Sequence, residues 1–393
     1  MSISVWLDEN HVAHGSDRDD IDVDVLIIGA GISGASIAWW LRESGMRVAL
    51  VDKGDVAAGA SGRNAGFVTC GSVEHYTRQV SRLGPDLAHT LWQHSQENLA
   101  LIRDQIVGEG GVDCDFRQAG TYSLAGSEHE LRELHESAAL MAARGIAVST
   151  VDEAHIADNL GARGFFGGAL FHDDGECHPV KLVRGITRLS GATVYPHHEV
   201  RRLESVTDGV RVHTQRAVFR ASFVVLATNG YSSEVHPWFA DKIYPTRGQI
   251  LVTEPVAPMM AAPCYCNHVL DYFRQLPDGR VLIGGFRQLA KDAEVGVADT
   301  PNPEIHVALE AFLRRHFERL EKTRVAYRWA GIMGFSQDGL PMIGSLPGQP
   351  QIYFIGGFTG HGIGQAFRVA QVLSEVMLEG KSAGPYSARR FVA

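Results

Sequence analysis

The segment DVDVLIIGAGISG, residues 22–34, decides the fold. Residues 22–28 form a short apolar run rich in β-branched side chains, which predicts a buried strand. Residues 35–43 follow with helical spacing, and residues 47–51 predict a second buried strand that ends at Asp52. Strand, helix and strand make a βαβ unit, which we expect to be parallel and right-handed.

The turn inside this unit has the spacing of a phosphate-binding site. Gly29, Gly31 and Gly34 form a G-x-G-x-x-G motif between the strand and the helix. The first glycine makes the tight turn, the second lets a pyrophosphate approach the backbone, and the third lets the helix pack closely on the strand. Asp52 is placed to accept hydrogen bonds from a ribose diol. The unit therefore predicts a dinucleotide-binding site, with the phosphates at the helix N-terminus.

A second loop rich in glycine and small residues indicates which dinucleotide is bound. Residues 58–67, AGASGRNAGF, follow directly after the second strand. A nicotinamide enzyme has no need of such a loop there, whereas the longer FAD must be cradled from its adenosine to its ring. The loop favours FAD. A nicotinamide-dependent dehydrogenase is the weaker alternative, because it leaves this loop and the GGFTGHGIG segment at residues 356–364 unexplained.

Composition and charge exclude several classes of protein. Of 393 residues, 45% are hydrophobic and 21% charged, so the chain is globular rather than disordered. Glycine is in excess, at 43 residues, or about 11% against a usual ~7%. The net charge of −9 argues against a nucleic-acid partner. The uncharged stretch at residues 25–41 is short for a membrane span and contains the glycine motif, so we expect no transmembrane span.

The cysteines indicate reduced thiols rather than a disulfide framework. There are five, at wide spacing, and the N-terminus lacks the pattern of a signal peptide, so we expect a cytoplasmic protein. Cys264, Cys266 and His268 are the only metal-like grouping in the sequence. They lack a second ligand pair at a suitable spacing, and we therefore predict no metal site.

Several motifs in the same order resemble one known family. The chain is similar to the FAD-dependent amine and amino-acid oxidoreductases that include D-amino-acid oxidase, glycine oxidase and sarcosine oxidase. Four segments, GASGRN, CDFRQAGTYSLA, LDYFR followed by DGRVLIGG, and RWAG, most resemble the γ-glutamylputrescine oxidoreductase branch. The segments that carry the wider resemblance are GAGISG (29–34), LVDKG (50–54), GASGRNAGF (59–67), FVVLATNGY (223–231), PTRGQIL (245–251), RWAGIMGFSQDGLPMIG (328–344) and GGFTGHGIG (356–364).

The resemblance implies an α/β fold with an α+β substrate part. A Rossmann-like FAD-binding domain would be joined to a second, antiparallel-sheet substrate domain, with the flavin ring between them. We expect a polar N-terminal tail over residues 1–20. The FAD-binding domain would be discontinuous, over residues 21–90, 150–235 and 325–393, and the substrate domain would take residues 91–149 and 236–324.

The same resemblance implies the chemistry. An FAD-dependent amine or amino-acid oxidase or dehydrogenase oxidises a C–N bond by hydride transfer to flavin N5, and the resulting imine is hydrolysed. The substrate would be a small-molecule amine, namely a secondary amine, a polyamine derivative or an N-substituted amino acid, and the electron acceptor O2 or another molecule. The alternative is a non-catalytic or electron-transfer flavoprotein subunit of a larger dehydrogenase complex. Homo-oligomerisation stays open.

The motifs and the resemblance together predict the residues that bind the cofactor. They lie in the phosphate turn, at the end of the second strand, in the small-residue loop and in the later segments that resemble the family. These residues are Gly29, Gly31, Ile32, Ser33, Gly34, Asp52, Lys53, Ala60, Ser61, Arg63, Asn64, Ala65, Gly66, Phe67, Val200, Ala227, Thr228, Asn229, Gly331, Gly357, Gly360, His361, Gly362 and Ile363.

Three residues are predicted to act on the substrate side. Tyr272 and Arg274 alternate on one strand, so both side chains can face the same side. Tyr272 would offer a π contact and Arg274 an anion clamp, and the alternative for both is a surface or inter-strand pairing. His361 would lie beside the flavin ring and tune it, unless only its backbone matters.

Departures from the family pattern refine these expectations. Members that oxidise small α-amino acids carry an arginine shortly after the W-A-G motif, whereas Ile332, Met333 and Gly334 stand here. Gly360, a second candidate position for that arginine, is not basic either, which argues against glycine oxidase or D-amino-acid oxidase activity. No cysteine lies near W-A-G, so we expect non-covalent FAD. Residues 281–284 are apolar where sarcosine oxidases carry an oxygen-activating lysine, and oxidase versus dehydrogenase stays open.

Overall fold

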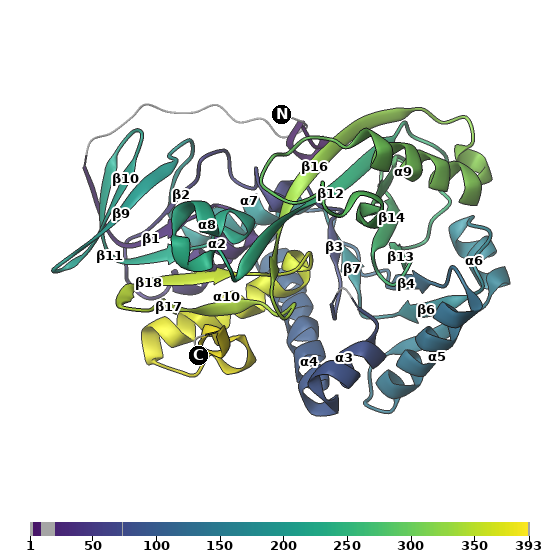
Figure 1. Ribbon diagram of the computed structural model, residues 1–393, viewed down its shortest axis with the longest axis horizontal. Helices are drawn as coiled ribbons and strands as arrows, with labels where there is room; N and C mark the ends of the chain where they lie inside the picture. The colour runs from purple at the N-terminus through teal and green to yellow at the C-terminus, as the bar shows by residue number, and fades with distance from the viewer. Residues whose placement is uncertain (1–2, 9–19, 73, 392–393) are drawn as a thin grey trace.

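The computed structural model of the chain describes residues 3–8, 20–72 and 74–391 (Figure 1). Two sheets of eight strands each organise these residues, together with a small two-stranded sheet. The first large sheet lies on the left of Figure 1 and most of the second lies on the right. Long strands β12 and β16 of the second sheet reach back towards the first. The two sheets agree with the mixed α/β fold predicted from the sequence.

The first sheet contains the predicted βαβ unit at its centre. Strand β1 runs parallel to both β2 and β11, with Ile28 opposite Val51 and Leu226. Its last four residues are buried, as expected for a strand covered on both faces. The strands in sheet order are β17 (Met342–Leu346), β18 (Gln349–Gly356), β11 (Val218–Leu226), β1 (Ile21–Ile28), β2 (Val48–Val51) and β8 (Thr193–Tyr195), and β10 (Gly209–Thr214) and β9 (Val200–Val206) extend β11.

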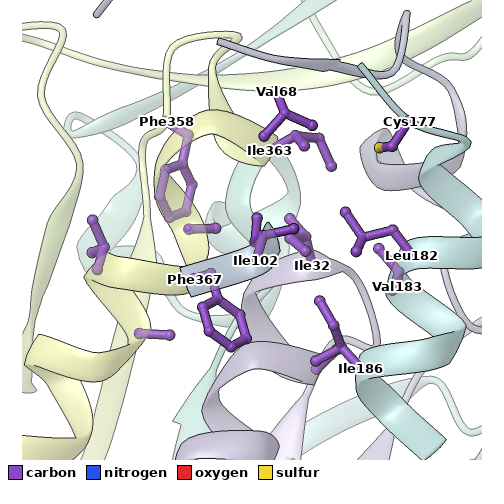
Figure 2. Packing of buried hydrophobic residues seen from close by; sticks show 14 of the residues in the cluster. Ile32, Val68, Ile102, Cys177, Leu182, Val183, Ile186, Phe358, Ile363 and Phe367 are labelled. Carbon is purple, nitrogen blue, oxygen red and sulfur yellow. The ribbon is translucent and has the colours of Figure 1, made fainter. Parts of the chain in front are cut away.

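Helices pack into an apolar core beside this sheet. Helix α2 contacts both α7 and α10, and α10 also contacts α4. Figure 2 shows Ile32 from α2, Ile186 from α7 and Phe367 from α10 meeting in this core. The helices are α2 (Ile32–Leu41), α4 (Pro85–Leu101), α7 (Pro179–Ser190) and α10 (Gly362–Glu379), and a π-helical segment (Ile102–Glu109) continues α4.

The second sheet is antiparallel apart from one pair, because β13 and β4 run parallel. Its strands in order are β16 (Val325–Ser336), β12 (Ile243–Thr253), β15 (Val281–Gly284), β14 (Asp271–Gln275), β13 (Cys264–Cys266), β4 (Thr121–Leu124), β6 (Gly168–Phe171) and β5 (Val148–Val151). The helices associated with it are α3 (Tyr76–Leu83), α5 (Glu128–Ala142), α6 (Glu153–Leu160) and α9 (Pro303–His316). All five cysteines are free and buried.

Strand pairing departs from the expected domain boundaries. Strand β16 pairs along its length with β12, and β5 and β6 pair with each other and with β4. All three strands therefore belong to the second sheet, although β6, β16 and the second half of β5 fall in residues 150–235 and 325–393, which were expected in the FAD-binding part. Helix α4, of which residues 91–101 were expected in the substrate part, packs on α10 instead. The cause is long-range hydrogen bonding and packing, which the local pattern of residues does not report.

The start of the chain also differs from a loosely held tail. Residues 5–8 form a short helix, α1 (Val5–Asp8), in which Val5 and Trp6 are buried. The indole Nε1 of Trp6 donates to the backbone oxygen of Asn64 at 2.8 Å. Residues 9–19 of the expected tail lie outside the described residues.

Two further elements, β3 (Phe67–Val68) and β7 (Gly175–Glu176), form the small sheet, and α8 (Ser232–Val235) follows β11.

Among the described helices, none combines the length and the apolar character that crossing a bilayer requires.

Candidate active site

A cavity of about 890 Å³ joins the two sheets and gathers most of the predicted site residues. Its walls come from the β1–α2 turn, the end of β2, the small-residue loop and the start of α10, and also from strands β13 and β14 of the second sheet. The predicted residues that line it are Gly29, Gly31, Ile32, Ser33, Asp52, Lys53, Ala60, Ser61, Arg63, Asn64, Ala65, Phe67, Val200, Ala227, Thr228, Asn229, Gly331, Gly360, His361, Gly362, Ile363 and Tyr272. Gly34, Gly66, Gly357 and Arg274 do not line it.

The turn between β1 and α2 has the backbone geometry that the motif predicts, although Gly34 does not line the cavity. Gly29 has a φ of +110°, which a residue with a side chain rarely adopts. A Cβ at Gly34 would lie 1.9 Å from the backbone oxygen of Gly29, so Gly34 allows the helix to pack on the strand and stands back from the cavity. A Cβ at Gly31 would lie 2.9 Å from Ser61 Oγ. Side chains at these positions would not fit, so the turn would present only backbone atoms to an approaching pyrophosphate.

Asp52 is held rigidly at the end of β2. Its Oδ2 accepts from the amide of Ala30 at 2.8 Å, and its Oδ1 accepts from the amide of Gly54 at 2.8 Å. Burial raises the pKa of this carboxyl, and the two amides oppose the rise. Beside it, the ammonium of Lys53 lies 3.6 Å from the ring centre of Tyr231, a cavity residue that the sequence reasoning missed. This arrangement fits the ribose end of FAD.

Arg63 and Asn64 order the small-residue loop. The Arg63 guanidinium donates to the backbone oxygens of Ala58 and Ala330, each at 3.1 Å, and pairs with Asp299 at 3.1 Å. It thereby ties the loop to strand β16. The side chain of Asn64 donates to the backbone oxygens of Ala60 and Ser61 and accepts from the amide of Gly66. Both side chains also line the cavity.

Arg274 does not act as the expected anion clamp at this cavity. Its side chain is buried, with Nε 3.0 Å from Glu176 Oε2. One guanidinium nitrogen donates to the backbone oxygens of Ala65, Gly66 and Cys177, each at 3.1 Å. Tyr272 and Arg274 do lie on the same face of strand β14, as the alternation predicts. Further along the strand, however, Arg274 contacts the small-residue loop instead of the cavity. Arg274 therefore supports that loop from below.

Two of the expected cofactor glycines have structural roles. Gly66 has a φ of +75° and gives its backbone oxygen to Arg274. Gly357 has a φ of +73° and donates its amide to Asn229 Oδ1 at 2.9 Å. Both shape the loops that line the cavity without facing it themselves. The sequence of these loops does not show which glycines face the cavity and which support the loop, because glycines and small residues alternate throughout.

The part of the cavity wall formed by β13, β14 and the residues before α10 is aromatic and uncharged. Phe67 lies edge-on to Tyr265, with ring centres 5.0 Å apart, and Tyr265 stacks on His361 at 6.1 Å. Burial raises the pKa of the Tyr265 and Tyr272 phenols, so both are neutral at neutral pH. Burial also lowers the pKa of His361 to about 4, so its imidazole is neutral there too. Gly284 makes room for Tyr272, because a Cβ there would lie 2.5 Å from the phenol ring.

Arg287 is a functional candidate that the sequence reasoning missed. It lines the cavity, and its Cζ lies 4.6 Å from the ring centre of Phe335. Within the described part of the chain its guanidinium forms neither a hydrogen bond nor an ion pair, and burial lowers its pKa. The nearby carboxylate of Glu294 already pairs with Nε of Arg247 at 3.3 Å. It also accepts a hydrogen bond from Nε2 of Gln249 at 2.8 Å. The guanidinium is therefore available to a ligand.

A constrained turn directs Arg287 out of the second sheet. This arginine follows the strand VLIGG, where a residue can be turned out of the sheet, and Phe286 before it has a φ of +57°. A bulky residue in this left-handed region is uncommon and marks a constrained turn. The family pattern places the carboxylate arginine after W-A-G or at the position of Gly360, where this chain has no basic residue, and both positions belong to other segments of the wall.

The whole chain resembles known proteins. Residues 24–376 match the family model DAO, described as FAD dependent oxidoreductase. The chain is 28% identical over 377 residues to γ-glutamylputrescine oxidoreductase of Escherichia coli strain K12, with 92% of this chain and 84% of that protein covered. It is 26% identical over 387 residues to an opine oxidase subunit of Agrobacterium tumefaciens strain Ach5, with 95% and 98% covered. A crystal structure of glycine oxidase from Geobacillus kaustophilus shares the fold, with a TM-score of 0.79 and 22% identity over 93% of this chain and 98% of that one.

Proposed function

The chain belongs to the DAO family of FAD-dependent oxidoreductases, and from that premise we propose that it oxidises a C–N bond of a small amine that carries an anionic group. It is an FAD-dependent oxidoreductase of the amine or amino-acid oxidase type. The finer proposal concerns the substrate. An N-substituted amino acid, or a polyamine derivative with a carboxylate, is the class that the cavity supports best.

The single observation that carries this proposal is the free guanidinium of Arg287. Holding a charge partly out of water costs free energy unless a partner of opposite charge is supplied. Arg287 has no such partner in the described protein, and it lies in the cavity wall with Phe335 against one face. A guanidinium presents a planar fork that matches a carboxylate in bidentate geometry. A substrate carboxylate would supply the missing partner.

The remaining side chains favour a neutral amine beside that anchor. Tyr265, Tyr272 and His361 supply no negative charge, so desolvation of the substrate beside them would lower the pKa of its amine. His361 directly precedes α10, whose first residue, Gly362, also lines the cavity. The start of that helix would place positive partial charge where negative charge develops. When bound, FAD accepts the hydride from the carbon next to nitrogen.

Non-covalent FAD binding remains part of the proposal. All five cysteines are buried, and none of them lines the cavity. The glycine turn, Asp52 and the small-residue loop offer backbone amides and a carboxylate, which suit a phosphate and a ribose held by hydrogen bonds. Flavin released by heat denaturation with none left on the protein would support this. The five free thiols also support a cytoplasmic location.

The test compares matched substrates by anaerobic bleaching of the flavin absorbance. Each N-alkylated amino acid is paired with the amine that lacks its carboxylate. The proposal expects the acid to reduce the flavin at concentrations at least about tenfold below those its partner needs, since each 1.4 kcal/mol of anchoring is a factor of ten. Equal efficiency of acid and amine would contradict the role of Arg287, and a colourless protein that releases no FAD would contradict the proposed function altogether.

A second candidate is a flavoprotein that passes electrons to a partner protein within a larger complex. The similarity to a protein named as one subunit of an opine oxidase favours keeping it. Strand β15 offers only apolar residues, Val281–Gly284, at the position expected for an oxygen-activating lysine. Rapid turnover with hydrogen peroxide formed under air would favour an oxidase. Flavin that is reduced by substrate and reoxidised only by an artificial acceptor would favour a complex of this kind or a dehydrogenase.

A further inference from the structure

A cluster of histidine and glutamate side chains lies next to the cavity wall, outside the site described above. His75 precedes α3, Glu130 and Glu133 lie on α5, and His268 lies in the turn between β13 and β14. One potential ligand atom each from His75, Glu130 and His268 lies within 4.8 Å of the others. Three segments far apart in the sequence thus bring typical metal ligands together. We refer to these four residues as the His–Glu cluster.

His75 is the member that most needs a ligand. Its side chain is only 2% exposed. Neither ring nitrogen has a hydrogen-bond partner within the described residues. Nδ1 lies 3.1 Å from Glu133 Oε1, and Nε2 lies 4.0 Å from Glu130 Oε1, so both nitrogens face carboxylates. A buried imidazole that points its lone pair at carboxylates can be satisfied by a shared cation.

Glu130 is positioned as a metal ligand would be. Its Oε2 accepts from the amide of Gly126 at 2.9 Å, and its Oε1 accepts from the amide of His268 at 2.5 Å. These bonds fix the carboxylate while leaving each oxygen a further lone pair. Oε1 lies 3.9 Å from the Nδ1 of His268 and 4.0 Å from the Nε2 of His75. Backbone donors that orient a ligating carboxylate are a usual feature of metal sites.

We propose that the His–Glu cluster binds one divalent transition-metal ion of the zinc type. His75, His268 and Glu130 supply three ligands, and Glu133 supplies the fourth. Zinc bonds to nitrogen and oxygen of about 2.1 Å place tetrahedral ligands about 3.4 Å apart. Glu130 Oε1 lies 4.0 Å from His75 Nε2 and 3.9 Å from His268 Nδ1, and Glu133 Oε2 lies 3.7 Å from His268 Nδ1, so each of these separations exceeds the tetrahedral spacing by less than about 1 Å. Small rotamer changes of His268, whose side chain is 34% exposed, would close the site.

The guanidinium of Arg78 contacts two of the proposed metal ligands and would compete with the metal ion for them. It pairs with both oxygens of Glu133, at 2.5 and 2.8 Å, and lies 3.2 Å from His268 Nδ1. A metal ion would displace it from His268. The Arg78 side chain is 48% exposed and can swing into solvent while still pairing with one oxygen of Glu133. Arg78→Met is therefore expected to tighten metal binding severalfold, because it removes a like charge.

The site would stabilise a constrained part of the cavity wall. Asn267, His268 and Val269 have φ values of +50°, +56° and +68°, an unusual run for residues other than glycine. The next residue along the turn, Leu270, lines the cavity together with Val269. A metal on His268 would tie this turn to α3 and α5. The sequence predicted no metal site from Cys264, Cys266 and His268, and the structure separates them, because both cysteines are buried in β13.

The test uses tag-free holoprotein dialysed against chelator and then titrated with ZnCl2. We expect one zinc per chain, bound with micromolar or tighter affinity. His268→Ala and His75→Ala should each weaken binding by at least tenfold. His135→Ala, which removes an exposed histidine from the same helix α5, is the matched control and should bind like wild type. Flavin content and circular dichroism report that each variant is folded.

Cobalt supplies a second readout that does not depend on the variants. Co2+ bound to wild type should give visible absorption bands of tetrahedral coordination, and ZnCl2 should abolish them. Failure of wild type to bind either ion stoichiometrically overturns the proposal. If His268→Ala binds zinc as tightly as wild type, the proposal is overturned as well. The variant is suitable for this test because the His268 side chain is half-buried and its loss leaves the buried carboxylates in place. None of these outcomes depends on the identity of the substrate.

Discussion

The guanidinium carbon of Arg287 lies 4.6 Å from the ring centre of Phe335. Both residues line the same cavity as the phosphate turn. Phe335 comes from β16 and Arg287 from the turn after β15, so the two meet only in the folded chain. The aromatic face holds the cation in place without neutralising it. Under the proposed function, this pair would hold the anionic end of the substrate at one side of the cavity.

Replacing Arg287 tests that assignment. Arg287→Ala should raise the anaerobic Kd for a carboxylate substrate about tenfold or more, since hydrogen bonds to a charged group contribute about 1.5–3 kcal/mol. Arg287→Lys should recover part of the loss, because it restores charge but not the planar fork. Lys291→Ala, which removes a more exposed cation of the same wall, is the control. Kd values that are unchanged in Arg287→Ala would show that this arginine does not hold substrate.

Ser61 should matter for FAD and not for substrate. Its Oγ accepts from the amide of Ile32 at 2.8 Å, which joins the small-residue loop to the phosphate turn. Ser61→Ala is expected to weaken FAD binding about fivefold, in line with a net contribution of about 1 kcal/mol for one hydrogen bond. Ser61→Thr keeps the hydroxyl and should bind FAD nearly normally. Fluorescence of released flavin measures the affinity, and equal FAD affinities in Ser61→Ala and wild type would be the contrary result.

Arg274 should be essential for stability. Arg274→Met leaves Glu176 with only Arg117 as its cation and removes the donor to three backbone oxygens. Breaking a buried pair from one side typically costs about 3–5 kcal/mol, so we expect a clear fall in the thermal midpoint and loss of FAD. Adding Glu176→Gln should restore part of the lost stability. A stable, FAD-replete Arg274→Met variant whose only defect is substrate binding would instead revive the anion clamp.

The neutral state of His361 predicts how stability depends on pH. Its pKa falls from 6.5 to about 4 in the fold through burial. Between those values the unfolded chain binds a proton that the native chain does not. Stability is therefore lost as pH falls through this window, at up to about 1.4 kcal/mol per pH unit for one such group.

The measurement compares the urea midpoints of wild type and His361→Gln at pH 7 and pH 5. The variant should lose less stability between the two values. His178 and His306 have pKa values lowered to about 4 as well, so a residual loss remains in both proteins. Identical losses in wild type and variant would mean that His361 is already protonated or solvated in the native state.

The parts of the site that could be predicted from sequence depend on local spacing. Gly29, Gly31 and Asp52 belong to one βαβ unit whose geometry follows from strand, turn and helix. Ser61 and Asn64 belong to a loop whose composition already indicated close backbone approach to a cofactor. In such segments the backbone geometry depends on residues within one short stretch, so the pattern of residues reports it.

The parts that could not be predicted depend on partners distant in the chain. Arg274 and Arg287 both follow apolar strand residues, and only tertiary packing sends one under the loop and the other into the cavity. The buried position of Trp6 depends on Asn64 in the same way, although it precedes a polar stretch. Strand β16 pairs with β12 rather than with its sequence neighbour β17. Each case is a long-range contact with no local signature.

The most direct test of the substrate assignment is a double comparison in stopped-flow flavin reduction under anaerobic conditions. Wild type and Arg287→Ala are each mixed with an N-alkylated amino acid and with the amine that lacks its carboxylate. The account predicts that wild type prefers the acid by at least about tenfold, the factor that 1.4 kcal/mol of anchoring supplies, and that the variant loses this preference while the amine still reduces its flavin. A preference for the acid that persists in Arg287→Ala would contradict it.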